Sequence, residues 1–339
     1  MSIFKLPNEL ILHIFTYLDN AEVDRLICNY RGVPSARPVL CILYQRLFGG
    51  ALHITNEDPR LQFEHDYEVT VSAFEDKMSD DSFENNLFRL TRPNTIEFRF
   101  TRQHNDYRRF ISDLNSLTAL FDSSDATITN YLRRCSRINL HIDAHLVFME
   151  NPDSLKSIII KLLLDLSGHP IAYKLENLTI KSSEIGSLYV AHWSQLFKNF
   201  TSLRNLDISE NLLRSNYESY LDVWGMSRKF PETLTRLNLK NNMLTYVSKD
   251  FLSNLPKSLQ FLDMNQNDIE IIEPCQLGEL LPGLQNWCLN YTKLCVMSPS
   301  MFKSCPRGFV LEIRSTYLPD SDVQKLTLIA EKGGFKVLV

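Results

Sequence analysis

The chain has 339 residues, of which 44% are hydrophobic and 22% charged, so it can bury a sizeable core in one elongated or two compact domains. The formal net charge of −4 gives no reason to expect a nucleic-acid partner, and neither of the glycine-rich phosphate-loop patterns occurs. Lys161 and Asp165 interrupt the longest apolar run before it reaches about 18 residues, so no membrane partner is expected.

The first fifty residues predict three short helices. The first, within residues 4–20, starts at Leu6-Pro7, because proline at the first helical turn loses no hydrogen bond. Two apolar stripes follow at helical spacing: Leu10, Ile14 and Leu18 form one, and Ile11 and Phe15 form the other. The second and third helices are expected within 22–32 and 35–50. Together the three carry more apolar surface than they can hide, so they either cap the rest of the chain or present that surface to another protein.

An acidic stretch comes next. Residues 57–85 hold ten Asp or Glu against Arg60 and Lys77. This charge run predicts that residues 51–90 form an acidic linker or a hinge, solvated on the outside.

The second half of the chain contains five internal repeats. They fit the pattern L-x-x-L-x-L-x-x-N-x-L, and their starts lie 28, 31, 25 and 25 residues apart, at Leu175, Leu203, Leu234, Leu259 and Leu284. This is the leucine-rich repeat, in which each unit supplies one strand and one return segment. The clear repeats cover 175–296, and degenerate repeats flank them within a domain of 91–339.

Side chains alternate along each strand, so the second and third apolar positions of every repeat are expected to point into the core. No single repeat can enclose them, and neighbouring repeats must therefore stack. Asn211, Asn242 and Asn267 are predicted to form a ladder that bonds backbone groups of adjacent turns. Ser183 and Thr292 take the Asn position in the first and fifth repeats.

Return segments and flanking strands complete the expected architecture. Helices are predicted within 186–200 and 216–230, a shorter helical turn before Pro256, and a long helix from Asp320. Weaker strands are expected at 93–100, 135–144, 309–313 and 335–339. The fold class is therefore α/β: a leucine-rich-repeat solenoid with a parallel concave sheet and helical convex returns, preceded by a small all-α segment.

The strand residues that alternate with the core are expected to face the concave surface and to contact a protein substrate. Taken singly, each of them fits a solvated sheet face better. Taken together, their amides, charges and one aromatic ring suit a polar peptide, and the cations among them suit an acidic or phosphorylated one. The candidate substrate-binding residues are Lys181, Asp207, Arg236, Asn238, Lys240, Phe261, Asp263, Asn286 and Asn290.

The first predicted helix resembles an F-box. Its segment LPNELILHIFTYLD, Leu6 to Asp19, follows the family pattern L-P-x-E-[LI]-[LI]-x-x-I-[FL]-x-[YF]-L-[DP], with a looser match to about residue 48. The later part of the family pattern includes a Trp, which is missing here. The resemblance implies an F-box over 1–50 and a member of the class that combines an F-box with leucine-rich repeats.

In that class the F-box binds a Skp-type adaptor on a cullin scaffold, and the repeats present a protein substrate for ubiquitin transfer. The resemblance thus implies a non-catalytic substrate receptor of a ubiquitin ligase, and it assigns seven residues to the adaptor interface: Leu6, Pro7, Leu10, Ile11, Ile14, Phe15 and Leu18. Two alternatives stay open. In the first, the chain is an F-box module that acts outside a ubiquitin ligase. In the second, it is a repeat scaffold, and the N-terminal helices only cap it.

Nothing in the sequence indicates catalysis, a cofactor or a metal. His141, Asp143 and His145 alternate along an expected strand, but two His and one Asp are far more often a surface feature than a metal site. The seven cysteines form no C-x-x-C pair, and the N-terminal apolar stretch is interrupted by Glu9 and His13. A reducing compartment, cytoplasmic and/or nuclear, is therefore expected.

Overall fold

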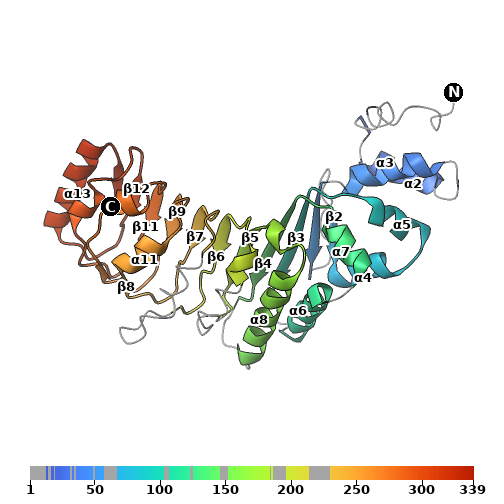
Figure 1. The fold of residues 1–339 in the computed structure, drawn as a ribbon, viewed down its shortest axis with the longest axis horizontal. Coiled ribbons are helices and arrows are strands. Elements are labelled where there is room, and N and C mark those ends of the chain that lie inside the picture. The colour runs from blue at the N-terminus through green and yellow to red at the C-terminus, as the bar shows by residue number, and fades with distance from the viewer. Residues whose placement is uncertain are drawn as a thin grey trace. The chain divides into compact units, whose positions relative to one another are not determined.

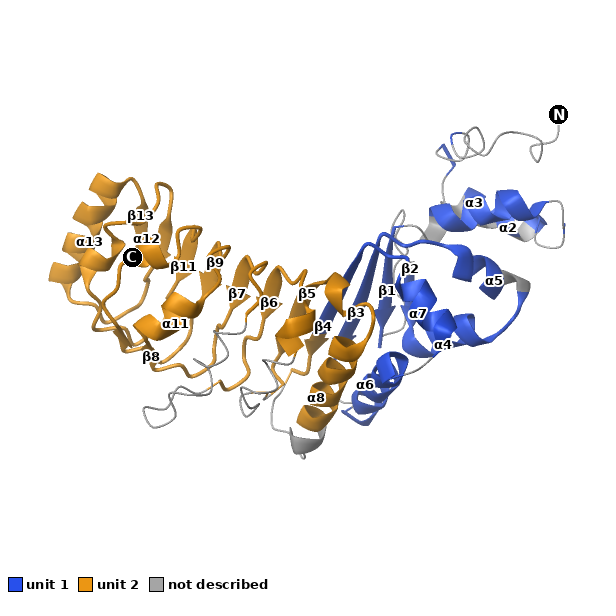
Figure 2. Ribbon diagram, viewed as in Figure 1, with its two compact units in different colours: residues 1–101, 106–141 blue, residues 102–105, 142–339 orange. Residues whose placement is uncertain are grey.

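A computed structural model gives the fold of the chain (Figure 1). It describes residues 13, 17–18, 20–30, 33, 36–48, 50–56, 67–102, 107–122, 125–145, 152–183, 185, 196–213 and 230–339. These residues form two compact units, shown in Figure 2: unit 1 comprises 1–101 and 106–141, and unit 2 comprises 102–105 and 142–339.

Unit 1 combines a parallel sheet with helices. Its strands are β1 (Ala51–Thr55), β2 (Tyr67–Thr70), β3 (Thr95–Thr101) and the first part of β4 (Arg137–Asp143), in the order β2-β1-β3-β4. Its helices are α2 (Asn20–Tyr30), α3 (Arg37–Phe48), α4 (Val71–Ser79), α5 (Phe83–Leu90), α6 (Tyr107–Asp122) and α7 (Ala126–Leu132). Every second residue of β3, namely Ile96, Phe98 and Phe100, is fully buried, as the strand period requires.

The sequence does not decide whether residues 51–90 form a hinge or a flexible linker. In the structure, residues 51–56 and 67–90 are folded. β1 pairs in parallel with both β2 and β3. Thr70 Oγ1 accepts a hydrogen bond from Ala73 N (3.2 Å) to begin α4, and Ser82 Oγ accepts one from Asn85 N (3.3 Å) to begin α5. The segment folds because apolar residues such as Leu52, Ile54 and Phe74 outweigh its acidic character locally. Residues 57–66, the start of the acidic run, lie outside the described residues.

Helices α2 and α3 confirm two of the three helices expected near the N-terminus. Val23 of α2 and Val39, Leu40 and Leu43 of α3 are buried, and α3 packs against both α2 and α5. Gln45 holds the end of α3 with a pair of hydrogen bonds: its amide donates to Arg92 O (3.1 Å) and accepts from Arg92 N (2.8 Å). The described part of the N-terminal region is thus tied to the rest of unit 1.

Unit 2 has its strands in strict chain order. β5 (Leu175–Lys181), β6 (Asn205–Asp207), β7 (Arg236–Asn238), β9 (Phe261–Asp263), β11 (Asn286–Cys288), β12 (Val310–Glu312) and β13 (Lys336–Leu338) are neighbours in one parallel sheet. β8 (Tyr246–Val247) and β10 (Ile271–Ile272) form a second, two-stranded sheet. The helical segments are α8 (Pro152–Gly168), η3 (Ala172–Lys174), α11 (Lys249–Asn254), α12 (Leu277–Leu280), η5 (Pro299–Phe302) and α13 (Asp320–Gly333).

The core of unit 2 is the one the repeats predict. All ten inward positions are buried, with at most 1% of any residue exposed: Leu178, Ile180, Leu206, Ile208, Leu237, Leu239, Leu262, Met264, Trp287 and Leu289. The strands expected at 309–313 and 335–339, the helical turn before Pro256 and the helix from Asp320 are also present. Most of the two long returns, 186–195 and 214–229, lies outside the described residues. Unit 2 is a leucine-rich-repeat solenoid.

The asparagine ladder forms as predicted. Asn242 Oδ1 accepts from Asn211 N (2.8 Å) and Leu213 N (3.3 Å) of the preceding repeat, and its Nδ2 donates to Ile208 O (2.9 Å) and Leu239 O (3.0 Å). Asn267 repeats this arrangement one step along, with Asn242 N (2.9 Å) and Leu244 N (3.0 Å). Each amide therefore satisfies buried backbone groups in two successive repeats.

Candidate functional site: the open face of the sheet

The open face of unit 2 is defined by the strand residues that alternate with the buried core. Strand register places Asn177, Asn205, Arg236, Phe261 and Asn286 opposite one another in a first column. The second column holds Thr179, Asp207, Asn238, Asp263, Cys288 and Glu312. Eight of the nine residues named from the sequence as substrate-binding lie on this face with part of their surface exposed, whereas Asn290 is buried.

The centre of the open face is an arginine stacked on an aromatic ring. The guanidinium carbon of Arg236 lies 4.3 Å from the ring centroid of Phe261, and the two residues are directly opposite on β7 and β9. Arg236 is exposed and Phe261 is half-buried, so the pair presents a flat surface with a positive charge above it. Arginine and aromatic side chains of this kind carry much of the binding free energy at protein interfaces.

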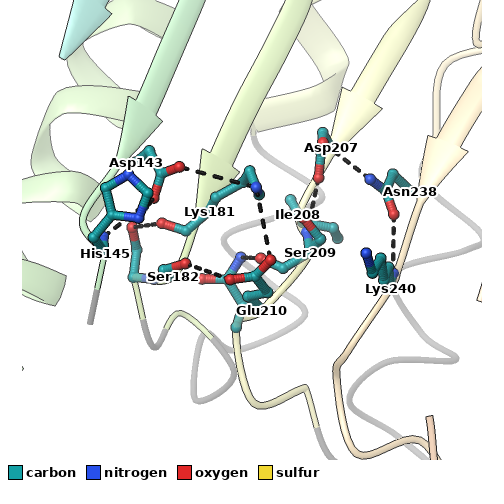
Figure 3. A network of polar contacts seen from close by, with 12 residues as sticks. Asp143, His145, Lys181, Ser182, Asp207, Ile208, Ser209, Glu210, Asn238 and Lys240 are labelled. Atoms are coloured by element: carbon teal, nitrogen blue, oxygen red, sulfur yellow. Dashed lines mark hydrogen bonds and ion pairs between the residues drawn. The ribbon is translucent and has the colours of Figure 1, made fainter. Parts of the chain in front are cut away.

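The polar residues around this pair are held by short local bonds. Asp207 Oδ1 accepts from Ser209 N (3.0 Å), and Asp207 Oδ2 accepts from the Asn238 amide (3.0 Å). Asn238 Oδ1 in turn accepts from Lys240 N (3.0 Å), as Figure 3 shows. These bonds fix the orientation of the Asp207 and Asn238 side chains before any partner arrives, which lowers the entropic cost of binding.

Lys181 is engaged by two carboxylates. Its Nζ lies 3.9 Å from Asp143 Oδ2 and 3.6 Å from Glu210 Oε1, and Glu210 also accepts from Ser182 Oγ (2.9 Å) (Figure 3). Asp143 accepts a further hydrogen bond from His145 N (3.1 Å). Lys181 therefore does not offer an unpaired cation to a phosphate group, although the sequence groups it with the cations of this face.

Asp143 and Glu210 are the residues that the sequence did not single out as partners of Lys181. Asp143 is the last residue of β4, and Glu210 lies three residues after the end of β6; these are the strands on either side of β5. A carboxylate one residue before the repeat asparagine was the only signal for Glu210. For His141, Asp143 and His145, the structure shows no metal-type cluster of three or more His, Cys, Asp or Glu within the residues it describes.

The second column is rich in carboxylates. Burial raises the pKa of Asp263, and the nearby carboxylates of Asp207 and Glu312 act in the same direction, while the Asn265 N–H and Lys240 oppose them. Burial, together with Glu312 and Asp263, raises the pKa of the Cys288 thiol to about 12, so this cysteine is protonated at neutral pH and is a poor nucleophile. The column thus favours donors and cations from a partner over additional anions.

Asn290 belongs to the framework of this face. Its amide donates to Glu312 Oε2 (2.7 Å), and its Oδ1 accepts from Arg314 N (2.8 Å). Only 6% of the residue is exposed. Its role is therefore to link β11 to the following repeat and to position the Glu312 carboxylate.

The residues assigned to an adaptor interface fall almost entirely outside the described part of the chain. Leu6, Pro7, Leu10, Ile11, Ile14 and Phe15 are among the residues not described. Leu18 is half-buried, and its carbonyl accepts a hydrogen bond from the Arg46 guanidinium of α3. None of the helices described is long and apolar enough to span a membrane.

Comparison with known proteins finds partial similarity in sequence and in structure. No protein-family model matches the chain. It is 36% identical to Toll-like receptor 10 of Bos taurus over 143 residues, which is 38% of this chain and 15% of that receptor. It covers 45% of a chain in the crystal structure of the mouse RP105/MD-1 complex, with 88% of its own length aligned, 16% identity and a TM-score of 0.47. The chain thus spans only a small part of its curated relative, and neither similarity is to an F-box protein.

Proposed function

We propose that this chain is a non-catalytic protein-binding scaffold whose open face receives a segment of a partner protein. The Arg236–Phe261 pair carries the proposal, because it is an exposed cation–π stack at the centre of a face whose surrounding polar side chains are already oriented. Amides in the first column, such as Asn205 and Asn286, surround it. This combination suits recognition of a peptide more than chemistry on a substrate.

The charges of the open face favour a neutral or basic partner segment over a phosphorylated one. Lys181 is paired with two carboxylates, and Asp207, Asp263 and Glu312 lie along one column. A phosphate placed over this column would meet like charges, whereas a lysine or an amide would meet acceptors. The phosphopeptide reading of the sequence is therefore the weaker of the two.

The test is cross-linking mass spectrometry in cells that express the full chain. We expect the double variant Arg236→Ala, Phe261→Ala to lose partners that the wild type recovers, with an unchanged melting temperature. Arg204→Ala is the matched control, because Arg204 is an exposed arginine outside the two columns. Identical partner sets for all three proteins would show that the open face is not the binding surface.

A second candidate function, substrate receptor of a Skp–cullin–F-box ubiquitin ligase, is favoured by one observation: the dense F-box pattern from Leu6 to Asp19. The adaptor would bind the first helix, and the open face would hold the substrate. Co-purification with a Skp-type adaptor tests it, with wild type compared against Leu6→Ala, Pro7→Ala. A complex lost only in the variant supports this function, and the absence of any complex with a folded wild-type chain leaves the scaffold function alone.

We further propose a cytoplasmic or nuclear location. Six of the seven cysteines, all those except Cys28, are free thiols in the structure. Alkylation of the denatured, unreduced protein from its native source should modify all seven cysteines. Incomplete alkylation that reduction restores would indicate disulfides and an oxidising compartment.

A further inference from the structure

A second candidate binding surface lies along the edge where the chain turns off the strands. Here a polar groove of about 550 Å³ opens in unit 2. Its lining includes the residues just before the ladder position in four successive repeats, Asn241, Gln266, Tyr291 and Ser315. This surface, called the turn-edge groove below, is separate from both columns of the open face.

The lining also includes residues just after the ladder position. Asp268, Lys293 and Tyr317 occupy this place in three successive repeats. Lys293 Nζ lies 2.8 Å from Asp268 Oδ1, and this hydrogen-bonded carboxylate raises the pKa of Lys293. The two charges neutralise each other, so this pair favours neither an acidic nor a basic ligand.

The buried residues that line the groove belong to the ladder, at the point where threonine replaces asparagine. They are Asn267 and Thr292. Asn211 N and Asn242 N each donate to the amide oxygen of the next repeat (2.8 and 2.9 Å), but Thr292 uses its hydroxyl to donate to Leu289 O (2.9 Å). The structure shows no equivalent ladder bond from Asn267 N, in a region where every residue is described. The groove therefore opens where a backbone donor lacks the acceptor that it has in earlier repeats.

Two tyrosines also line the groove, with most of their surface in solvent. Tyr291 is 64% exposed and Tyr317 is 72% exposed. Tyr291 also has a left-handed backbone with φ of 57°, a conformation that asparagine or glycine adopts more readily than an aromatic residue. The equivalent residues Glu210, Asn241, Gln266 and Ser315 share this conformation, so it belongs to the repeat. What distinguishes this part of the edge is the pair of exposed tyrosine rings, which gain little from burial.

The chemistry of the groove matches that of protein surfaces that bind other proteins. Tyrosine, asparagine and serine are the residues enriched in antibody binding sites, because they combine rigid amphipathic area with adaptable hydrogen bonding. The groove is shallow and mostly polar, unlike the enclosed apolar cavities that hold small molecules. The Asn267 N–H and side-chain amides can pair with both the carbonyl and the N–H groups of a backbone. We propose that the turn-edge groove binds an uncharged, extended peptide segment of a partner protein, held between Tyr291 and Tyr317.

The test is a selection with a displayed library of random linear 12-residue peptides on the full chain. Each selected peptide is then measured on wild type and on the double variant Tyr291→Asn, Tyr317→Ser. We expect at least tenfold weaker binding by the variant, together with an unchanged or higher melting temperature because asparagine relieves the left-handed backbone at residue 291. Peptides that bind both proteins equally would overturn the proposal.

Two controls separate this site from other surfaces. Tyr173→Ser changes an exposed tyrosine outside the groove and should leave peptide binding within twofold of wild type. Arg236→Ala changes the open face; peptides that lose binding with this variant as strongly as with the groove variant would belong to the open face and would overturn the proposal. A glycan array probed with the same proteins gives the remaining outcome. Glycan binding that is abolished in the groove variant, without any peptide binding, would show a saccharide site in place of a peptide site.

Discussion

Asn211, Asn242 and Asn267 show how one residue type can hold adjacent repeats together. Asn242 alone accepts from two backbone N–H groups and donates to three backbone carbonyls, those of Ile208, Leu239 and Lys240. It is completely buried, so none of these groups can turn to water if the amide is removed. The ladder therefore contributes to stability mainly because an unpaired buried group is costly, and less because each hydrogen bond is strong.

Asn242→Ala should lower the free energy of unfolding by about 1–3 kcal/mol, because it leaves buried backbone groups without partners. Chemical denaturation followed by circular dichroism measures this loss. Gln260→Ala, which removes an exposed amide from the following repeat, is the control and should change stability by less than about 0.5 kcal/mol. Equal effects for the two variants would argue against the ladder as a stabilising element.

Asp263→Asn should stabilise the protein at pH 7. Burial raises the pKa of Asp263 in the folded protein above its ordinary value of 3.8, so the folded state binds the proton more tightly than the unfolded state does. The wild type then loses stability as the pH rises from 3.8 through the folded pKa, and it keeps that penalty at higher pH. Denaturation curves at pH 7 and pH 4 should show the advantage of Asn shrinking at pH 4. An advantage that grows at pH 4 would contradict this assignment.

At the scale of elements, close packing of the return segments sets the tolerance to substitution. Gly278 of α12 lies against the backbone of the following return, where an added Cβ would come within 1.9 Å of Ser304 O. Gly168, the last residue of α8, has nothing within 4 Å of the same position. The two glycines thus have opposite requirements.

Gly278→Ala should lower the free energy of unfolding by about 1–3 kcal/mol or more, because backbone has to move to admit the methyl group. Gly168→Ala should raise it by about 0.4–1 kcal/mol by restricting the unfolded chain. Melting curves of the pair provide the comparison. A similar loss of stability in both variants would mean that helix geometry, and not the contact with Ser304, sets the need for glycine.

The strands of the repeats could be predicted from the sequence, because each apolar position of the repeat pattern must be buried. Leu237 and Leu239 must be buried on any stacked arrangement of the pattern, and strand register then places Arg236 beside Phe261. The partners of Lys181 could not be predicted, because Asp143, at the end of β4, and Glu210, in the turn after β6, approach it only in the folded chain. The turn-edge groove could not be predicted for the same reason: its lining combines positions on both sides of the ladder, whose residue types the repeat pattern does not specify.

At the scale of the whole molecule, each unit has its own core, and the repeats of unit 2 depend on their neighbours. Phe335, between α13 and β13, completes an aromatic cluster: its ring centroid lies 6.4 Å from that of Phe302 and 5.8 Å from that of Phe309. α13 packs on η5, the element that contains Phe302. β13 also pairs with β12. α13 and β13 therefore hide apolar side chains and a strand edge together.

Deleting residues 319–339 should produce a protein that self-associates. The deletion uncovers Phe302 and Phe309 and leaves the β12 backbone unpaired, a combination that promotes pairing with other chains. Size-exclusion chromatography with light scattering should show oligomers for the truncated protein and a lower melting temperature. A truncated protein with the same mass distribution and melting temperature as the full chain would show that the preceding repeat is stable without this cover.

The change from asparagine to threonine after Asn267 should also affect the rate at which backbone amide hydrogens exchange with solvent. Backbone N–H groups of Asn211, Leu213, Asn242 and Leu244 each point at an amide oxygen inside the protein, and their hydrogens can reach solvent only when two repeats separate. In this part of the chain, which the structure describes throughout, the backbone N–H groups of Asn267 and Thr292 make no such hydrogen bond to a ladder side chain. Hydrogen exchange should therefore be slowest in the middle of the ladder and markedly faster at the turn-edge groove. Local opening of the repeats would then be most frequent where a partner would bind.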